Sequence, residues 1–296
     1  MAPAAVWTNR QGGTYGRADN IAWMPSPTYL AMRAYTRARL LAARFRRRSS
    51  TWQGVRILGY HRVADERNDL SVRPAAFRDH MEQVVAADVE PVRLDTALDL
   101  LQNRVEGRYL CVTFDDGYRD NLENAVPVLE ELRIPATIFV PTAIIDGTAT
   151  YSWFDHPPPA LSWEQISQLV RGGLVDVQAH TRSHPRLPHV SETTAREEIA
   201  GCKLDLEKRL GYEVTSFAYP AGLYTERDIR LVHEAGYRGA VTTEPGINVA
   251  GEPLHRLRRT LIYWTDRSGD FAVKLAGLLD EPPRSREWLY KRLAGR

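Results

Sequence analysis

Apolar and polar positions follow two different spacings from residue 55 onward. Residues 55–60 and 109–114 are short apolar runs bounded by polar sequence, which is typical of buried strands. Residues 74–88 open with Pro74 and carry apolar side chains at helical spacing, which predicts a helix. The same patterns recur and predict strands at 91–94, 136–140, 174–179, 216–219, 239–242 and 259–263, and helices at 95–103, 121–132, 162–172, 191–210, 225–235, 269–279 and 285–294.

This alternation of strands and helices predicts the fold class. Repeated strand–helix units are typical of an α/β protein with a parallel sheet, either doubly wound or closed into a barrel. A dinucleotide-binding sheet requires a glycine-rich turn after its first strand, and the sequence GYHR at 59–62 is not one. We therefore expect a single barrel-like domain at residues 51–296, with catalytic groups at the carboxyl ends of its strands.

The first fifty residues form a different kind of segment. Residues 1–28 are rich in glycine, proline, asparagine and threonine, and we expect a flexible tail there. Residues 29–48 have helical apolar spacing with arginines around the apolar stripe. Such a basic amphipathic helix is either a solvated or self-docked appendage, which we favour, or a peripheral contact with an anionic membrane surface.

Charge is spread unevenly along the chain of 296 residues. Segment 1–50 carries nine arginines and one acid, Asp19, which makes it +8; because the whole chain is +2, residues 51–296 carry −6. A mildly acidic body argues against nucleic acid as a partner. The sequence shows no secretory signal and no apolar run of about 18 residues. We expect a location in the cytoplasm or at the inner face of the membrane, with Met24 and Met32 as alternative starts.

Two acidic residues end one of the predicted strands. The apolar run 109–114 stops at Asp115-Asp116-Gly117. Adjacent carboxylates at the end of a buried strand repel each other unless a cation offsets their charge. Asp-Asp-Gly is also ordinary turn chemistry, so this motif alone leaves both alternatives open.

Two histidines follow another predicted strand. His180 and His184 come after the apolar run 174–179 and are four residues apart. If the segment turns helically, both imidazoles lie on one face and converge on one point. Imidazole suits Zn²⁺, Ni²⁺, Co²⁺ or Fe²⁺, and one carboxylate would complete a three-ligand site. The alternative is two ordinary histidines.

Together the two motifs predict a divalent metal centre, with Zn²⁺ as the expected ion and Ni²⁺, Co²⁺ or Fe²⁺ as alternatives. In a βα-repeat protein both motifs lie at the same end of the sheet. One acid and both imidazoles would bind the ion. The other acid would remain free to act as a base on water, whose pKa the ion lowers to about 7.

The motif TFDDG at 113–117, taken with HTRSH at 180–184, resembles the polysaccharide deacetylases of the NodB-homology type (carbohydrate esterase family 4). The resemblance spans residues 55–265. It implies a distorted (β/α) barrel and hydrolysis of the N-acetyl group of amino sugars. It also implies a catalytic base at Asp115 and metal ligands at Asp116, His180 and His184.

The sequences ILGYHRV at 57–63 and FAYPAG at 217–222 are similar to the exopolysaccharide deacetylases that act on poly-N-acetylglucosamine. The family's third motif contains Arg-x-Pro, whose arginine orients the base, whereas residues 218–220 read Ala-Tyr-Pro here. Arg259, ahead of Arg258, is a candidate to replace the missing arginine, although an ordinary role is favoured for both.

A second departure concerns the general acid. The family's Leu-x-His motif has no counterpart with the right spacing, because His255 directly follows Leu254. We expect His61 to be the replacement acid, since it follows the first strand, where a barrel would direct it to the centre.

The expected partner is a carbohydrate substrate of the N-acetylglucosamine type. We predict substrate contacts at Tyr219, Pro220 and Trp264, and an oxyanion contact from a backbone N–H of the 219–222 loop. Trp153 is a further candidate for stacking on a sugar, although packing is favoured for both tryptophans. Two alternatives remain open: a same-fold amidohydrolase acting on a non-polysaccharide amide, and a non-catalytic pseudo-deacetylase that only binds glycan.

Overall fold

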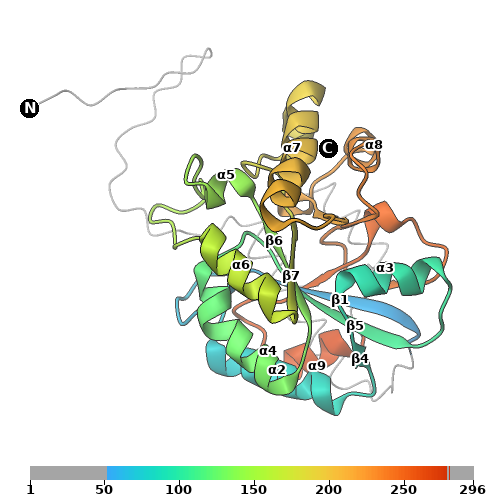
Figure 1. Cartoon of the computed structure of the whole chain (residues 1–296). Helices are drawn as coiled ribbons and strands as arrows, with labels where there is room; N and C mark the ends of the chain where they lie inside the picture. The colour runs from blue at the N-terminus through green and yellow to red at the C-terminus, as the bar shows by residue number, and fades with distance from the viewer. Residues whose placement is uncertain (1–51, 279, 281–296) are drawn as a thin grey trace, which may run out of the picture.

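The structure is a computed structural model that describes residues 52–278 and Asp280 (Figure 1). The predicted extension at 1–50, including the basic helix at 29–48, lies outside this range, as does the helix predicted at 285–294. No helix of the described range is long and apolar enough to cross a bilayer.

The strands form one large sheet, which is parallel except for a single antiparallel pair between β1 and β10. The strand order is β10-β1-β5-β6-β7-β8-β9, with β4 beside β5 and β11 beside β1. A second, small sheet pairs β2 with β3. The strands are β1 (Gly54–Tyr60), β2 (Arg62–Val63), β3 (Ser71–Val72), β4 (Glu90–Pro91), β5 (Arg108–Phe114), β6 (Ala136–Val140), β7 (Val175–Ala179), β8 (Ser216–Ala218), β9 (Gly239–Val241), β10 (Ile247–Asn248) and β11 (Thr260–Leu261).

The two ends of the sheet meet at residues 257–261, and this meeting closes the barrel. Leu257 forms a β-bridge with Val241 of β9. Its N–H donates to the carbonyl of Ala240, and its own carbonyl accepts from the N–H of Thr242. A few residues later, β11 pairs with β1. The predicted distorted α/β barrel is confirmed, and its seam runs between β9 and β1.

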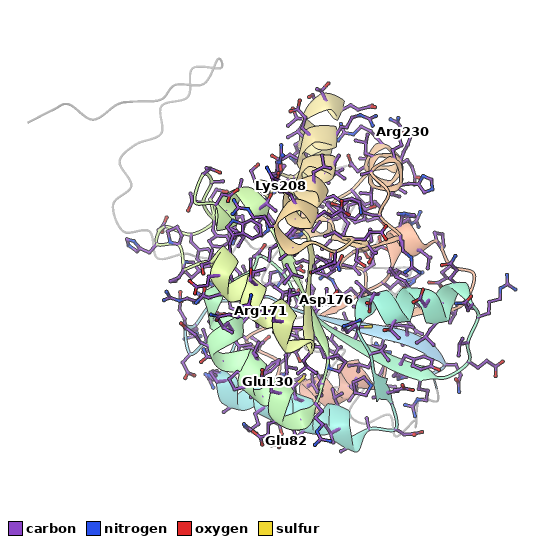
Figure 2. All side chains as sticks on the ribbon, viewed as in Figure 1. Glu82, Glu130, Arg171, Asp176, Lys208 and Arg230 are labelled. Carbon is purple, nitrogen blue, oxygen red and sulfur yellow. The ribbon has the colours of Figure 1, made fainter. Side chains whose placement is uncertain are left out.

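The helices pack mainly against the outside of the sheet (Figure 1). Their outer faces carry exposed charged side chains, of which Figure 2 labels Glu82, Glu130, Arg171, Lys208 and Arg230. The helix predicted over 121–132 begins as a π-helical turn, η1, and continues as α4. The helical elements are α2 (Pro74–Ala86), α3 (Leu94–Gln102), η1 (Asn121–Ala125), α4 (Val126–Leu132), α5 (Thr142–Ile145), α6 (Trp163–Gly172), η2 (Leu187–His189), α7 (Glu192–Leu210), η3 (Pro220–Gly222), α8 (Glu226–Glu234), η4 (Leu254–Arg256) and α9 (Ser268–Leu275).

Alternation along the strands separates two hydrophobic cores. On β5, Leu110 and Val112 pack in the outer core, beneath the helices, whereas Cys111 belongs to the inner core enclosed by the barrel. Because side chains alternate with a period of two, Thr113 and the following Asp115 point in the same direction as Cys111. The strand therefore directs the first aspartate of the pair into the barrel.

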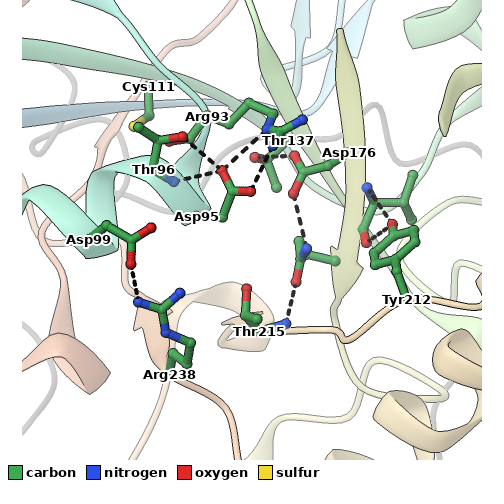
Figure 3. A network of polar contacts seen from close by, with 12 residues as sticks. Arg93, Asp95, Thr96, Asp99, Cys111, Thr137, Asp176, Tyr212, Thr215 and Arg238 are labelled. Carbon is green, nitrogen blue, oxygen red and sulfur yellow. Dashed lines mark hydrogen bonds and ion pairs between the residues drawn. The ribbon is translucent and has the colours of Figure 1, made fainter. Parts of the chain in front are cut away.

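A polar network cross-links β6, β7 and β8 at the end of the barrel opposite the Asp115 end (Figure 3). The carboxylate of Asp176 accepts hydrogen bonds from Thr137 Oγ1 (2.6 Å) and Gln178 Nε2 (3.0 Å). The amide oxygen of Gln178 in turn accepts from the N–H groups of Thr215 and Ser216. Burial raises the pKa of Asp176 to about 6, against the opposing effect of the hydrogen bonds from Thr137 and Gln178. At neutral pH the ionised carboxylate of Asp176 therefore destabilises the folded chain.

We predict that Asp176 makes the fold less stable as the pH rises. Its pKa of about 6 in the folded chain exceeds the value of about 3.9 expected for the unfolded chain. Between these values the folded chain binds more protons, so the contribution of Asp176 to the free energy of unfolding falls as pH increases. Relative to wild type, Asp176→Asn should therefore gain up to about 3 kcal/mol between pH 4 and pH 7.5, measured by urea unfolding. Asp95→Asn, at the neighbouring α3 terminus, is the control, and a pH-independent difference for Asp176→Asn would contradict the prediction.

Candidate active site

Three strands deliver the predicted chemical groups to one end of the barrel. His61, Asp115 and His180 each directly follow the last residue of a strand, respectively β1, β5 and β7. The N–H of Asp115 still donates to the carbonyl of Tyr60 (2.9 Å), and that of His180 to the carbonyl of Val140 (3.1 Å). The sheet ladder therefore continues through the first residue of each motif and fixes its backbone.

Left-handed residues turn the chain sharply after these strands. Asp116 has φ 70°, followed by Gly117 with φ 65°, and Thr181 and His184 have φ 61° and 58°. Non-glycine residues in this region are uncommon and are concentrated at functional sites. The helical turn proposed for 180–184 is therefore wrong: the two histidines converge through an irregular turn.

Side chains from the turn itself and from α7 hold that turn. The N–H of His184 donates to Thr181 Oγ1 (3.0 Å). Glu198 of α7 accepts from the N–H groups of Arg182 and Ser183, both at 2.8 Å, and from the Ser183 hydroxyl. The conformation that brings the second histidine back to the first is thus secured from outside the barrel.

Asp116, His180 and His184 form a compact group. One potential ligand atom from each residue lies within 4.8 Å of the other two. The Nε2 atoms of both histidines are 3.4 Å from Asp116 Oδ1. His180 Nδ1 lies 2.8 Å from the carbonyl oxygen of Ala218, so this nitrogen carries the proton and the Nε2 lone pair faces the group.

The dimensions of this triad fit a metal ion. Asp116 Oδ1 is buried and has no hydrogen-bond partner among the described residues. Ligands about 2.1 Å from a tetrahedral ion lie about 3.4 Å apart, which is the separation of Oδ1 from each imidazole nitrogen. Two imidazoles and one carboxylate also leave a coordination position open, as catalytic zinc sites do.

The charge states of Asp116 and His184 favour an ion as well. Burial alone would raise the pKa of Asp116, but the nearby imidazoles of His180 and His184, in their charged forms, lower that pKa well below its usual range. Burial lowers the pKa of His184 to about 4. At neutral pH, Asp116 is therefore anionic and His184 neutral, and these are the states that bind metal. Burial would lower the pKa of His180, but the adjacent carboxylates of Asp116 and Asp115 raise it, so an ion would have to displace a proton there.

Asp115 is held by a buried arginine that lies far away in the sequence. Arg259 donates from Nη1 to Oδ1 (2.6 Å) and from Nη2 to Oδ2 (2.7 Å) of Asp115, and both side chains are almost fully buried. Burial would raise the pKa of Asp115, but the charge of Arg259 lowers it below its usual value. Arg259 thus lies where a replacement for the missing arginine would lie, whereas Arg258 is directed to Glu252 (4.0 Å).

The surroundings of Arg259 explain how it fits there. Its Nε donates to the carbonyl of Thr242 (3.0 Å), and Nη1 lies 3.3 Å from Thr113 Oγ1. Gly59 of β1 leaves room for it, because a Cβ at that position would lie 3.2 Å from Arg259 Cδ and Nε and 2.6 Å from Leu261 Cδ2. This glycine was the signal in the sequence that a large side chain crosses β1.

His61 precedes Asp115 in the sequence, whereas His180 and His184 follow it. All four residues nevertheless lie at the same end of the barrel. Its Nε2 is 3.9 Å from Asp115 Oδ2, and its side chain is 13% exposed. Burial lowers the pKa of His61, against the opposing charges of Asp115 and Asp116. The structure thus brings the predicted acid next to the predicted base, with His61 neutral at pH 7.

The predicted substrate residues have different outcomes. Tyr219 is fully buried, and its hydroxyl donates to the carbonyl of His255, so the prediction that it packs on a sugar is wrong. Pro220 is buried at the start of η3. Trp264 is half-buried with Arg73 over its ring at 4.3 Å. Trp153, the further candidate for sugar stacking, lies against His184 with ring centroids 4.4 Å apart.

Comparisons with known proteins find similar sequences and structures. The family model described as polysaccharide deacetylase matches residues 102–240. A Bacillus subtilis protein named as a polysaccharide deacetylase, YxkH, is 28% identical over 208 residues, which are 70% of this chain and 70% of that protein. The poly-β-1,6-N-acetyl-D-glucosamine N-deacetylase of Staphylococcus epidermidis is 24% identical over 232 residues, covering 69% of this chain and 78% of the relative. The crystal structure of a polysaccharide deacetylase from Bacillus cereus superposes with a TM-score of 0.63 at 31% identity, covering 75% of this chain and 68% of that one.

We predict that the triad binds Zn²⁺ and that each member is required. Asp116→Asn and His180→Gln should each weaken Zn²⁺ binding by at least roughly 100-fold, since changes even outside the first ligand shell cost about 10- to 100-fold. Competition with a chromogenic chelator measures the affinity. His189→Gln, an exposed histidine on η2, is the matched control. Wild-type affinity in Asp116→Asn would show that the ligand set is wrong.

Proposed function

Since the chain belongs to the polysaccharide deacetylase family, we propose that it removes N-acetyl groups from an N-acetylated amino-sugar polymer or oligomer with a divalent metal ion as cofactor. One observation carries this proposal: Asp115, held by two hydrogen bonds from Arg259, directly precedes Asp116, which forms with His180 and His184 a group that could hold a metal ion. The relative from Staphylococcus epidermidis is named for poly-β-1,6-N-acetyl-D-glucosamine, which supports this substrate class.

Asp116, His180 and His184 would hold the ion. A divalent ion in this position supplies Lewis acidity, which polarises the amide carbonyl and lowers the pKa of water. We propose Zn²⁺, with Ni²⁺, Co²⁺ and Fe²⁺ as alternatives, because two imidazoles and one carboxylate suit these ions.

Asp115 is the proposed general base. Its lowered pKa keeps it ionised at neutral pH, and the bidentate contact with Arg259 fixes the plane of its carboxylate. It takes a proton from the attacking water as the oxygen of that water bonds to the carbonyl carbon. Because Arg259 occupies one side of both oxygens, the proton arrives on the side that faces the substrate.

His61 is the proposed route of the proton to the leaving group. The bond between the carbonyl carbon and the nitrogen breaks only when the amine gains a proton. His61 Nε2, 3.9 Å from Asp115 Oδ2, can take up the proton that Asp115 has accepted and donate it to the amine nitrogen. Direct transfer from protonated Asp115 is the alternative. In either case acetate and a free amino sugar are the products.

A backbone N–H of the 219–222 loop is the proposed oxyanion donor. The N–H of Tyr219 donates to Val241 O and that of Gly222 to Tyr219 O, and Pro220 has no N–H. Ala221 is the remaining residue of this loop and has a left-handed conformation, with φ 55° and ψ 14°. We assign the oxyanion contact to its N–H, since a donor fixed by the backbone needs no reorganisation during the reaction.

Two alternative functions are a glycan-binding pseudo-deacetylase and an amidohydrolase that acts on another amide. A pseudo-deacetylase that only binds glycan is disfavoured, because the proposed base and all three proposed ligands are in place. An amidohydrolase that acts on another amide, such as one in peptidoglycan, would use the same base and metal ligands. Acetate release from different substrates distinguishes such an amidohydrolase from an amino-sugar deacetylase.

We predict that metal-reconstituted protein releases acetate from N-acetylglucosamine oligomers and that Asp115→Asn abolishes this release. Loss of the base should lower kcat by about 10²- to 10⁴-fold, and EDTA should remove activity in wild type. Acetate is measured enzymatically with β-1,6-linked and β-1,4-linked oligomers and with peptidoglycan fragments. Release from peptidoglycan alone would favour the alternative amide, and metal binding without any release would favour a glycan binder.

We also predict that Arg259 sets the activity of Asp115. Arg259→Met should lower kcat by roughly 100-fold, because the base loses its orientation. Without the arginine the pKa of Asp115 rises, so the acidic limb of the pH–kcat/KM profile should move to higher pH. Arg259→Lys should restore the limb in part but not the full kcat, because one ammonium cannot replace the bidentate contact.

Arg258→Met is the matched control, since the neighbouring side chain is directed away from Asp115 to Glu252. Its pH profile should match wild type. An unchanged acidic limb in folded Arg259→Met, judged by circular dichroism, would exclude this role.

A further inference from the structure

We propose that Trp153 is the platform on which a pyranose ring of the substrate stacks beside the metal site. This inference rests on the proposed function and deepens it, because it identifies the part of the site that recognises a sugar ring rather than an acetamide group alone. Three observations support it: the position of the indole beside His184, the hydrogen bond that holds the indole, and the exposure of its side chain.

The indole of Trp153 borders the metal site directly. Its centroid lies 4.4 Å from that of His184, with 47° between the ring planes. The side chain is nevertheless 37% exposed, which is unusual for a tryptophan. One part of the ring therefore contacts a proposed metal ligand and another faces solvent, where a substrate must approach.

A chain of aromatic contacts holds the indole relative to the metal ligands. Trp153 Nε1–H donates to the hydroxyl of Tyr118 (3.2 Å). Tyr118 is fully buried and packs on Tyr151 with centroids 4.6 Å apart. The hydroxyl of Tyr151 donates to the carbonyl of Asp116 (2.9 Å). The platform is thus tied to the residue that supplies the carboxylate ligand.

The segment that carries Trp153 is attached a second time, further along the chain. The N–H of Leu161 donates to the carbonyl of Gly117, and the carbonyl of Pro159 accepts from the N–H of Arg119, both at 2.9 Å. Residues 151–161 are therefore bonded at both ends to the turn that follows β5. Such preorganisation lowers the entropy lost when a ligand binds.

Tyr151, Phe154 and His184 contact the indole of Trp153, but no cationic side chain in the described range covers it, unlike the other tryptophans that the structure describes. Arginines lie over the rings of the other three: Arg56 and Arg108 over Trp52, Arg209 over Trp163 and Arg73 over Trp264. No lysine or arginine of the described chain lies over Trp153. Its Nε1–H already donates to Tyr118, so the exposed part of the side chain is available for apolar contact with a ligand.

That surface matches the chemistry of an amino sugar. A pyranose with equatorial substituents presents a face of C–H groups, which packs on an aromatic ring, while its hydroxyls remain solvated. A small acyclic amide has no such face. Stacking on Trp153 would therefore place the N-acetyl group of a sugar next to the metal ligands without contributing to the binding of acetate.

The test compares Trp153→Leu and Trp153→Phe with wild type, all metal-loaded, on the β-1,6-linked N-acetylglucosamine pentamer. Trp153→Leu should raise KM by roughly 10- to 100-fold, as loss of an aromatic stacking partner does elsewhere, with kcat within about threefold. Trp153→Phe should retain most of the affinity. The inhibition constant of acetate, which has no ring, should stay within about twofold in both variants. Trp163→Leu, which removes an indole on α6, should behave as wild type.

Two outcomes would overturn the inference. One is an unchanged KM in Trp153→Leu. The other is a parallel change in KM and in the acetate inhibition constant, which would mean that the indole acts through His184 and the metal. If wild type releases no acetate, the proposed function fails, and stacking is then tested by fluorescence: the pentamer should quench wild-type emission but not that of Trp153→Phe.

Discussion

The ion pair between Asp115 and Arg259 is the constraint around which this barrel is arranged. Two adjacent carboxylates at the end of a buried strand are tolerated only if each receives compensation. Arg259 provides it for Asp115 through two short hydrogen bonds, and the metal triad offers a cation site for Asp116. Because Arg259 directly precedes β11, the strand that completes the barrel at β1, closing the barrel and orienting the proposed base Asp115 are one structural event.

Asp115 and Asp116 have the same side-chain chemistry, and their different backbone conformations place them in different surroundings. Asp115 continues the alternation of β5 and points into the barrel, where it accepts hydrogen bonds from the guanidinium of Arg259. Asp116 adopts a left-handed conformation, which directs its side chain to the two imidazoles. Environment then sets their functions: one carboxylate is fixed by an arginine and can take a proton, whereas the other is free to coordinate an ion.

The sequence was sufficient for the parts of the molecule that depend on local patterns. Strand–helix alternation predicted an α/β fold with a parallel sheet, and the missing glycine-rich turn favoured a barrel over a doubly wound sheet. The motifs at strand ends predicted a metal-ligand group that the structure does assemble. Arg259 was only a candidate for the contact with Asp115, and an ordinary role was favoured for it, because 144 residues separate the two and no local pattern encodes the contact. Tyrosine is a residue type that can stack on sugars, but Tyr219 is fully buried and therefore packs inside the protein. The left-handed conformation of Thr181 was equally hidden, since threonine has no preference for it.

The seam of the barrel has a consequence for how the chain is made. Asp115 leaves the ribosome 144 residues before Arg259 does. Until then, enclosing Asp115 would bury an uncompensated charge, which is strongly unfavourable. The nascent chain can therefore form its early strands and helices, yet it must keep the Asp-Asp turn hydrated. The final strand is thus the step that commits the polypeptide to a closed and chemically competent form.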